Sequence, residues 1–110
     1  MKIINLTPHV LNIFSSDKSR VATVAPSGEV ARCASTRALT SVRDGIEFFE
    51  TAFGAPSPLP EPEFDTIFVV SSLFLAGLRA AGLDRDDVYV PGEAVRDADG
   101  KVVGCQGLSR

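Results

Sequence analysis

Two serines stand at the start of the segment that reads most clearly as a helix. Ser71 and Ser72 follow an apolar, β-branched run at residues 66–70 and precede residues 73–81, whose helix-forming side chains end at Gly82. The N–H groups at a helix N-terminus lack partners inside the helix and, with the helix dipole, favour an anion. We therefore take Ser71 and Ser72 as candidate ligand-binding residues. The alternative is that a serine at this point only caps the helix.

A second short strand, predicted at residues 87–90, follows this helix and stops at Pro91 and Gly92. If the two strands are parallel neighbours, Pro91, Gly92 and Glu93 lie at the same sheet edge as the serines and form the other lip of a crevice. The helix is short for a parallel crossover. The patterns GxGxxG and GxxxxGK[ST] are absent, so the usual nucleotide fingerprints do not support this site.

Two further side chains are candidates for ligand contact. His9 is the only histidine and falls in a predicted loop, where an imidazole can act as acid, base or ligand contact near neutral pH. Arg32 lies in a predicted strand at residues 30–34, and its guanidinium suits a carboxylate or a phosphate. The alternatives are a structural or exposed histidine and an arginine in a surface ion pair.

The two cysteines, Cys33 and Cys105, are expected to be reduced thiols. We expect Cys33 to be buried in a strand and Cys105, between glycines, to be the more accessible. A zinc site would need a fourth ligand besides these cysteines and His9, and the acidic residues 84–87 lack the spacing of a calcium loop. A small enzyme using His9 with Cys105 or a serine lacks any recognised nucleophile motif. We therefore expect no metal and no cofactor, and we favour a non-enzymatic protein.

The composition bounds the class of protein. A chain of 110 residues forms one domain with a single core. Its net charge of −3 provides no global attraction to nucleic acid. No apolar run approaches the ~20 residues that a membrane helix needs, and the amino terminus lacks the apolar core of a signal peptide. We expect a cytoplasmic protein that binds neither nucleic acid nor a membrane.

Short strands account for most of the remaining chain. Asp44-Gly45 and Asp99-Gly100 are hairpin-type dipeptides, residues 46–53 favour a strand, and residues 35–43 read as a loop with a short strand near Leu39. Proline-rich residues 55–63 predict a connector between a β-rich N-terminal half and a strand–helix–strand and hairpin C-terminal half. The predicted fold class is α+β, with a mostly antiparallel sheet or partly closed barrel of short strands and one main helix at about residues 72–81. Several strand edges favour a homo-oligomer.

Several short motifs, spread over nearly the whole chain, carry a resemblance. They are Ile4-Asn5-Leu6-Thr7-Pro8-His9, Pro26-Ser27-Gly28 followed by Ala31-Arg32, Phe53-Gly54, Leu59-Pro60-Glu61-Pro62, residues 66–71, residues 87–92 and Gly104-Cys105-Gln106-Gly107-Leu108. In these motifs the chain resembles small phage and prophage proteins of actinobacterial-type origin. The resemblance implies no particular reaction. Small accessory proteins of this origin often act by binding, either sequestering a nucleotide signal or blocking a host enzyme.

These observations lead to one expected function and one alternative. We expect a small phage or mobile-element accessory protein that binds a small anionic, nucleotide-derived ligand near Ser71 and Ser72, with help from Arg32 or His9. The alternative is an inhibitor or adaptor that contacts a host protein through its acidic surface and the proline-rich residues 55–63.

Overall fold

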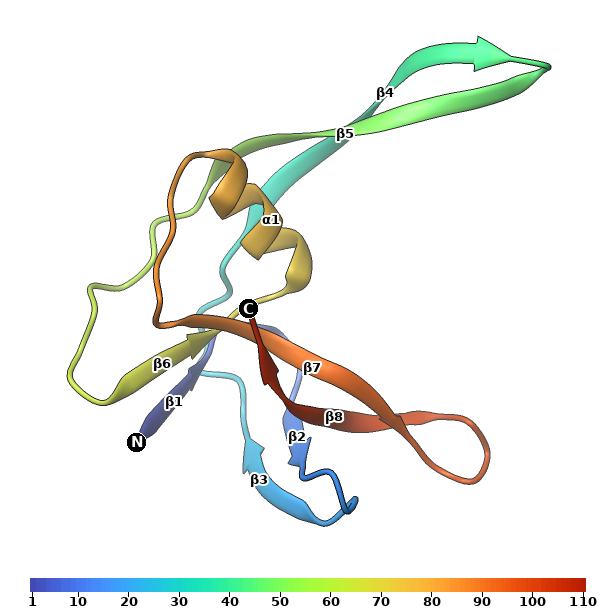
Figure 1. Cartoon of the computed structure of the whole chain (residues 1–110). Coiled ribbons are helices and arrows are strands. Elements are labelled where there is room, and N and C mark those ends of the chain that lie inside the picture. Colours follow the sequence, from blue (N-terminus) through green and yellow to red (C-terminus); the bar gives the residue numbers. More distant parts are fainter.

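The computed structural model describes all 110 residues, which form a sheet-based body and a long projecting arm (Figure 1). The elements in chain order are β1 (Lys2–Asn5), β2 (Leu11–Phe14), β3 (Arg20–Val24), β4 (Cys33–Arg43), β5 (Ile46–Pro56), β6 (Thr66–Val69), α1 (Ser72–Ala80), β7 (Val88–Arg96) and β8 (Val102–Ser109). Six strands form one sheet in the order β1-β6-β7-β8-β2-β3, and β4 pairs only with β5. We call the six-stranded sheet with α1 the body, and the β4–β5 hairpin the arm. No helix is long and apolar enough to cross a membrane.

The sheet of the body is mixed. β6 is parallel to both β1 and β7, and β2 is parallel to β8. The β7–β8 and β2–β3 pairs are antiparallel. The broad α+β class is confirmed, but the expectation of a mostly antiparallel sheet was wrong for the body. Hairpin signals reveal only antiparallel pairs of strands that are adjacent in the chain, whereas the parallel pairs β1–β6 and β2–β8 join strands that are distant in the sequence.

The strand–helix–strand unit is confirmed, but its second strand does not stop at Pro91 and Gly92, because β7 continues through both residues to Arg96. Phe68 pairs with Val88 in parallel register between β6 and β7, and α1 lies between these strands in the chain. Ser71 is the N-cap of α1: its backbone is extended, and its side chain accepts a hydrogen bond from the N–H of Phe74 at 3.1 Å. Gly82 follows the helix with a φ of +78°, the left-handed conformation that commonly ends a helix.

Both faces of the sheet contribute to the core. Phe68 and Val70 of the β6 segment face α1, whereas Val69 between them faces β2 and β8, as expected from the alternation of side chains along a strand. Leu73 is about half exposed, because the buried side of α1 begins at Phe74. Ala81 is also exposed. The larger cluster consists of Leu6, Phe68, Val70, Phe74, Leu75, Leu78, Val88 and Val90, and the smaller one of Leu11, Ile13, Val69 and Cys105.

The two edge strands of the body come together at their ends. The N–H of Ser27, just after β3, donates to the backbone oxygen of Asn5 in β1 at 2.9 Å. The Asn5 side chain donates to the carbonyl of Val24 at 3.3 Å. The sheet is therefore nearly closed on itself, in the manner of a barrel, and this contact occupies part of the edges that an open sheet leaves free.

The first strand of the arm differs from the sequence prediction in two respects. Residues 35–43 were expected to be a loop with a short strand near Leu39, but they belong to β4, a continuous eleven-residue strand that begins at Cys33. The strand predicted at residues 30–34 was therefore also misplaced. The physical reason is that residues 34–52 are all exposed. A strand that buries neither face needs no alternation of apolar and polar side chains, and alternation is the pattern by which a strand is recognised. The predicted Asp44-Gly45 turn is confirmed, with φ of +54° and +77°.

The proline-rich connector runs from the end of β5 to β6 against the body. Leu59 packs on the larger core cluster. The N–H of Ser57 donates to the carbonyl of Arg32 at 2.8 Å, and the Ser57 hydroxyl accepts from the N–H of Arg32 at 2.9 Å. The carbonyl of Pro60 accepts from the guanidinium of Arg85 at 2.8 Å. The connector is thus fastened to the body at several points along its length.

Candidate functional site

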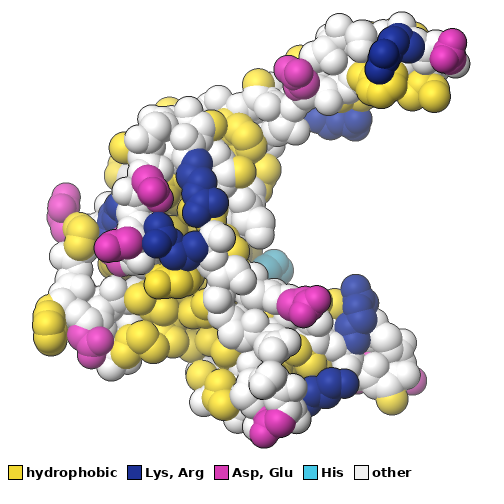
Figure 2. All heavy atoms as spheres, viewed as in Figure 1, with side chains coloured by type: hydrophobic (Ala, Val, Ile, Leu, Met, Phe, Trp, Pro, Cys, Tyr) yellow, Lys and Arg dark blue, Asp and Glu magenta, His cyan; other side chains and the backbone are white.

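A hollow of about 510 Å³ lies where the start of α1 meets the loop after β1 and the middle of β7. We call it the helix-start hollow. Figure 2 shows His9, the only histidine, in the recess between the arm and the β7–β8 hairpin. The residues that line the hollow carry no carboxylate, lysine or arginine. They are Thr7, Pro8, His9, Leu11, Ser71, Ser72, Pro91 and Gly92.

Three of the four candidate residues therefore meet at one place. His9, Ser71 and Ser72 line the helix-start hollow together with Pro91 and Gly92, which were predicted to form its other lip. Glu93 was also expected at this lip but does not line the hollow. The parallel pairing of β6 and β7 produces this geometry, because it brings the carboxyl end of β6 beside residues that follow the start of β7.

Arg32, the fourth candidate, lies apart from the other three. It immediately precedes β4, its side chain is exposed, and it does not line the helix-start hollow. Its backbone N–H and carbonyl are both paired with Ser57. The backbone of Arg32 therefore has a structural part in fixing the connector.

The start of α1, where Ser71 and Ser72 line the hollow, has hydrogen-bond donors without partners inside the helix. Because Ser71 caps the N–H of Phe74, the amides of Ser72 and Leu73 are the first-turn donors without an acceptor inside the helix. The first turn contains no acidic side chain, and Arg79 lies in the last turn. The positive end of the helix dipole therefore borders the hollow, and neither the first turn nor the lining of the hollow carries a carboxylate.

Asn5 and Thr7 position the loop that carries His9, and sequence reasoning missed both. Asn5 is only 1% exposed; its side-chain oxygen accepts from the N–H of Thr7 at 2.9 Å and from the Thr7 hydroxyl at 2.7 Å. Its amide nitrogen donates to the carbonyl of His9 at 2.7 Å. The available signal was an asparagine two residues before a threonine, next to a proline, which is typical of a side-chain-stabilised turn.

Gly92, which lines the helix-start hollow, lets the backbone of β8 approach β7 closely. A Cβ atom at this position would lie 2.8 Å from the carbonyl oxygen of Gly107 and even closer to that of Gln106. Only glycine allows β7 and β8 to approach this closely. A side chain at position 92 would therefore push β8 away from β7.

A second hollow, of about 390 Å³, adjoins the first. It shares His9, Leu11 and Pro91 with the helix-start hollow and continues over β2 and β8, where Val102 and Val103 line it. We call it the valine-lined hollow. Val10 and Val102 are both more than half exposed, so this surface offers apolar contact to a ligand.

The cysteines differ from the expectation. Both are free, but Cys105 is 5% exposed and Cys33 is only partly buried, so their expected order of accessibility was wrong. Cys105 is buried because β8 pairs with β2 on one side and with β7 on the other. Cys105 and His9 both line the valine-lined hollow, yet no hydrogen bond joins them. They do not form a nucleophile–base pair in this structure.

The acidic run at residues 84–87 forms a structural ion pair. Both carboxylate oxygens of Asp87 accept from the guanidinium of Arg85, at 2.7 and 3.0 Å. These hydrogen bonds hold the pKa of Asp87 below its usual range. The same guanidinium lies 5.5 Å from the centroid of the Phe68 ring. The ion pair therefore links three parts of the chain: the proline-rich connector at Pro60, the residue before β7 and the core at Phe68.

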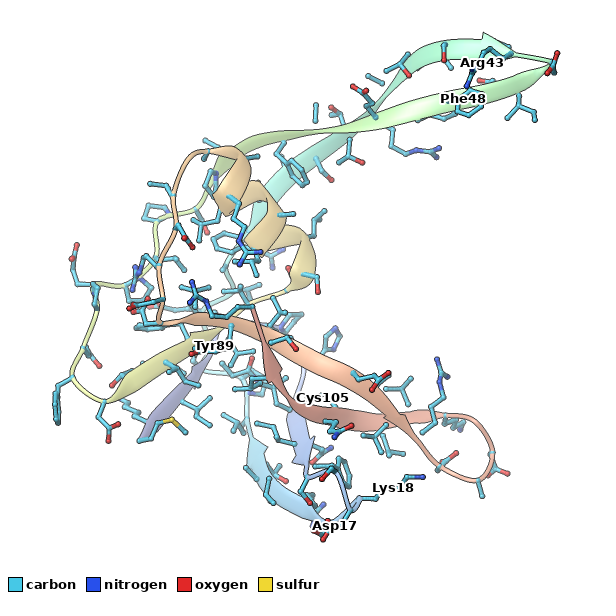
Figure 3. All side chains as sticks on the ribbon, in the orientation of Figure 1. Asp17, Lys18, Arg43, Phe48, Tyr89 and Cys105 are labelled. Atoms are coloured by element: carbon cyan, nitrogen blue, oxygen red, sulfur yellow. The ribbon has the colours of Figure 1, made fainter.

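The other carboxylate with a shifted pKa is Asp17, in the exposed turn between β2 and β3 (Figure 3). Hydrogen bonds from Ser15 and Ser19 lower its pKa to about 2. Asp17 lines neither hollow. No group of three or more His, Cys, Asp or Glu side chains is placed to hold a metal ion.

The helix-start hollow thus combines free amides, serine hydroxyls and an imidazole beside an apolar surface. These groups can hold an anion by hydrogen bonding, and the hollow contains no activated nucleophile. Comparison of the chain with protein-family models, with curated proteins and with solved structures finds no match.

Proposed function

We propose that the chain is a non-enzymatic binding protein for a small anionic, nucleotide-derived ligand held in the helix-start hollow. The supporting observation is that the start of α1, Ser72 and His9 converge on one hollow that lacks carboxylates. Its volume of about 510 Å³ falls within the range of ~300–1,000 Å³ that is typical of small-molecule sites. In this proposal the anionic group binds the amides of Ser72 and Leu73, and His9 contacts it from the facing wall.

The neighbouring hollow favours a nucleotide over a bare phosphate. The two hollows share His9, Leu11 and Pro91, so one ligand can occupy both. A nucleotide has a charged end for the helix start and a flat base for the apolar surface around Val102. Arg32 makes no direct contact in this arrangement. Sequestration of such a ligand agrees with the resemblance to phage and mobile-element accessory proteins.

Thermal unfolding with a panel of mono-, di- and cyclic nucleotides tests the proposal. We expect at least one nucleotide to raise the melting temperature, since a ligand at 100 times its Kd stabilises the folded state by about 2.7 kcal/mol. Ser72→Asp should fold, because an acidic side chain is favourable at a helix N-terminus. It should nevertheless lose the shift, because its carboxylate repels the anion.

Ser27→Asp is the matched control, since Ser27 is exposed and lines neither hollow. It introduces the same charge and should leave the ligand-induced shift unchanged. A melting temperature that no nucleotide moves would contradict the proposed function. A full shift in Ser72→Asp would show that the ligand binds elsewhere.

A further inference from the structure

The arm exposes apolar surface that the body does not cover. A two-stranded hairpin is only marginally stable in water without a third strand or a packed face. Only the base of this hairpin is packed, where Cys33 and Phe53 approach Gly77 of α1. Beyond the base, five large apolar side chains are 39–60% exposed: Leu39, Val42, Ile46, Phe48 and Phe49.

The projection of the arm is visible in the dimensions of the molecule. The radius of gyration is 16.4 Å, whereas a compact domain of this length has about 13 Å. Figure 1 shows β4 and β5 extending well beyond α1, with no other element beside them. The outer edge of each strand therefore carries unpaired backbone N–H and C=O groups.

The two strands of the arm carry opposite charges. β4 contains Arg37 and Arg43 and no acidic residue, whereas β5 contains Glu47 and Glu50 and no basic residue. Their register pairs each charged side chain with an uncharged one: Arg37 with Thr51, Arg43 with Ile46, Glu47 with Val42 and Glu50 with Ala38.

None of these charges has an ion-pair partner within the chain. All four ion pairs of the protein lie in the body or in the segments that join it. The arginines instead lie over aromatic rings of the arm. The guanidinium of Arg37 is 4.1 Å from the centroid of Phe49, and that of Arg43 is 5.1 Å from the centroid of Phe48, near the tip (Figure 3).

We infer that the arm is a self-association element whose partner is the arm of a second copy of this chain, with β4 of one copy against β5 of the other. A second arm presents both an acidic strand for β4 and a basic strand for β5. It also matches the first arm in length and in apolar content. Pairing β4 with β4, or β5 with β5, would instead bring like charges together. Contact between arms also covers the exposed aromatic side chains.

Sedimentation of charge-reversed variants tests this inference. The wild-type chain should sediment with at least twice the 11.7 kDa mass of one chain. Arg37→Glu with Arg43→Glu makes the whole arm acidic, and Glu47→Arg with Glu50→Arg makes it basic. Each double variant alone should associate ~100-fold more weakly, because like charges then face each other. An equimolar mixture of the two should recover the wild-type mass, because an acidic arm then meets a basic one.

Arg96→Glu with Lys101→Glu is the matched control, since it reverses two exposed charges on the β7–β8 hairpin. It should associate as the wild type does. A wild-type chain that is monomeric at ~0.1 mM, a concentration far above a micromolar Kd, overturns the inference and leaves the arm for another protein. A mixture that stays monomeric, or a control that dissociates, also overturns it. The inference does not depend on the helix-start hollow, whose test is the nucleotide-induced thermal shift.

Discussion

The body and the arm are both built of β-strands, but the strands of the body enclose a core whereas those of the arm remain exposed to solvent. In the body, six strands curl until Asn5 joins β1 to the end of β3, and no buried side-chain nitrogen or oxygen lacks a hydrogen-bond partner. In the arm, β4 and β5 are each eleven residues long and pair only with each other. Strand content alone therefore does not indicate where the stability of this chain resides.

The comparison separates residues that hold the fold from residues that are available for contact. Phe68 and Phe74 in the body are buried in the core, whereas Phe48 and Phe49 in the arm are partly exposed and each lies beside an arginine. The same residue type should therefore respond differently to the same substitution in the two regions. Four predictions make this difference measurable.

The largest effect is expected from Phe74→Ala, which removes a ring that is 1% exposed between α1 and the sheet. We expect the free energy of unfolding to fall by about 3–5 kcal/mol, because the cavity adds to the lost burial. Phe49→Ala in the arm should cost less than ~1 kcal/mol, measured by urea unfolding at a concentration where the chain is monomeric. Equal losses in the two variants would contradict the division into body and arm.

Asn5→Asp should destabilise the body by about 3 kcal/mol. The new carboxylate cannot donate to the carbonyls of His9 and Val24, and it places a charge at a buried position. Asn12→Asp is the matched control, because the Asn12 side chain makes an exposed hydrogen bond to the carbonyl of Val103 at 3.3 Å. We expect it to cost less than ~1 kcal/mol in the same urea titration. A control as damaging as Asn5→Asp would contradict the closing role of Asn5.

Asp87→Asn should cost about 2 kcal/mol at neutral pH, because it weakens two hydrogen bonds to the guanidinium of Arg85. The folded-state pKa of Asp87 is lowered by that guanidinium. Its contribution to stability is therefore complete above the ordinary pKa of 3.8 and is lost as the pH falls through the folded-state value. The stability difference between wild type and variant should shrink in acid. A difference that stays constant down to pH ~2 would exclude this linkage.

Gly77→Ala should loosen the joint between body and arm. Alanine ordinarily stabilises a helix relative to glycine by about 1 kcal/mol. Here its Cβ would lie 2.6 Å from the Cys33 sulfur and 3.3 Å from the Phe53 ring, so we expect a net loss of about 1 kcal/mol. The same substitution in a Cys33→Ala background should be neutral or stabilising. A loss of equal size in both backgrounds would exclude the sulfur as the obstacle.

The sequence was informative wherever the structure depends on neighbouring residues. Asp44-Gly45 and Asp99-Gly100 form the predicted turns of two hairpins, and Ser71 caps the predicted helix. Each of these features is determined by local backbone geometry. The meeting of Ser72 with Pro91 could also be predicted, because one parallel strand pair positions both.

The remaining features depend on contacts between distant residues. The pairing of Ile13 with Cys105 buries a cysteine that two flanking glycines had indicated as accessible. Arg32 lies outside the helix-start hollow, and its backbone is held by Ser57, which is 25 residues later in the chain. No periodicity in the chain encodes these distant pairings, so they could not be predicted from it.

The parallel pair of β2 and β8 also affects the order of folding during synthesis. β2 can pair with β8 only after Cys105 has been synthesised, whereas β4 can pair with β5 as soon as both strands have been made. Hairpins form within microseconds, far faster than a ribosome adds residues. The growing chain therefore exposes the apolar side chains of the arm before its barrel can close. We therefore expect premature association to be favoured where many nascent chains lie side by side, as on a polysome.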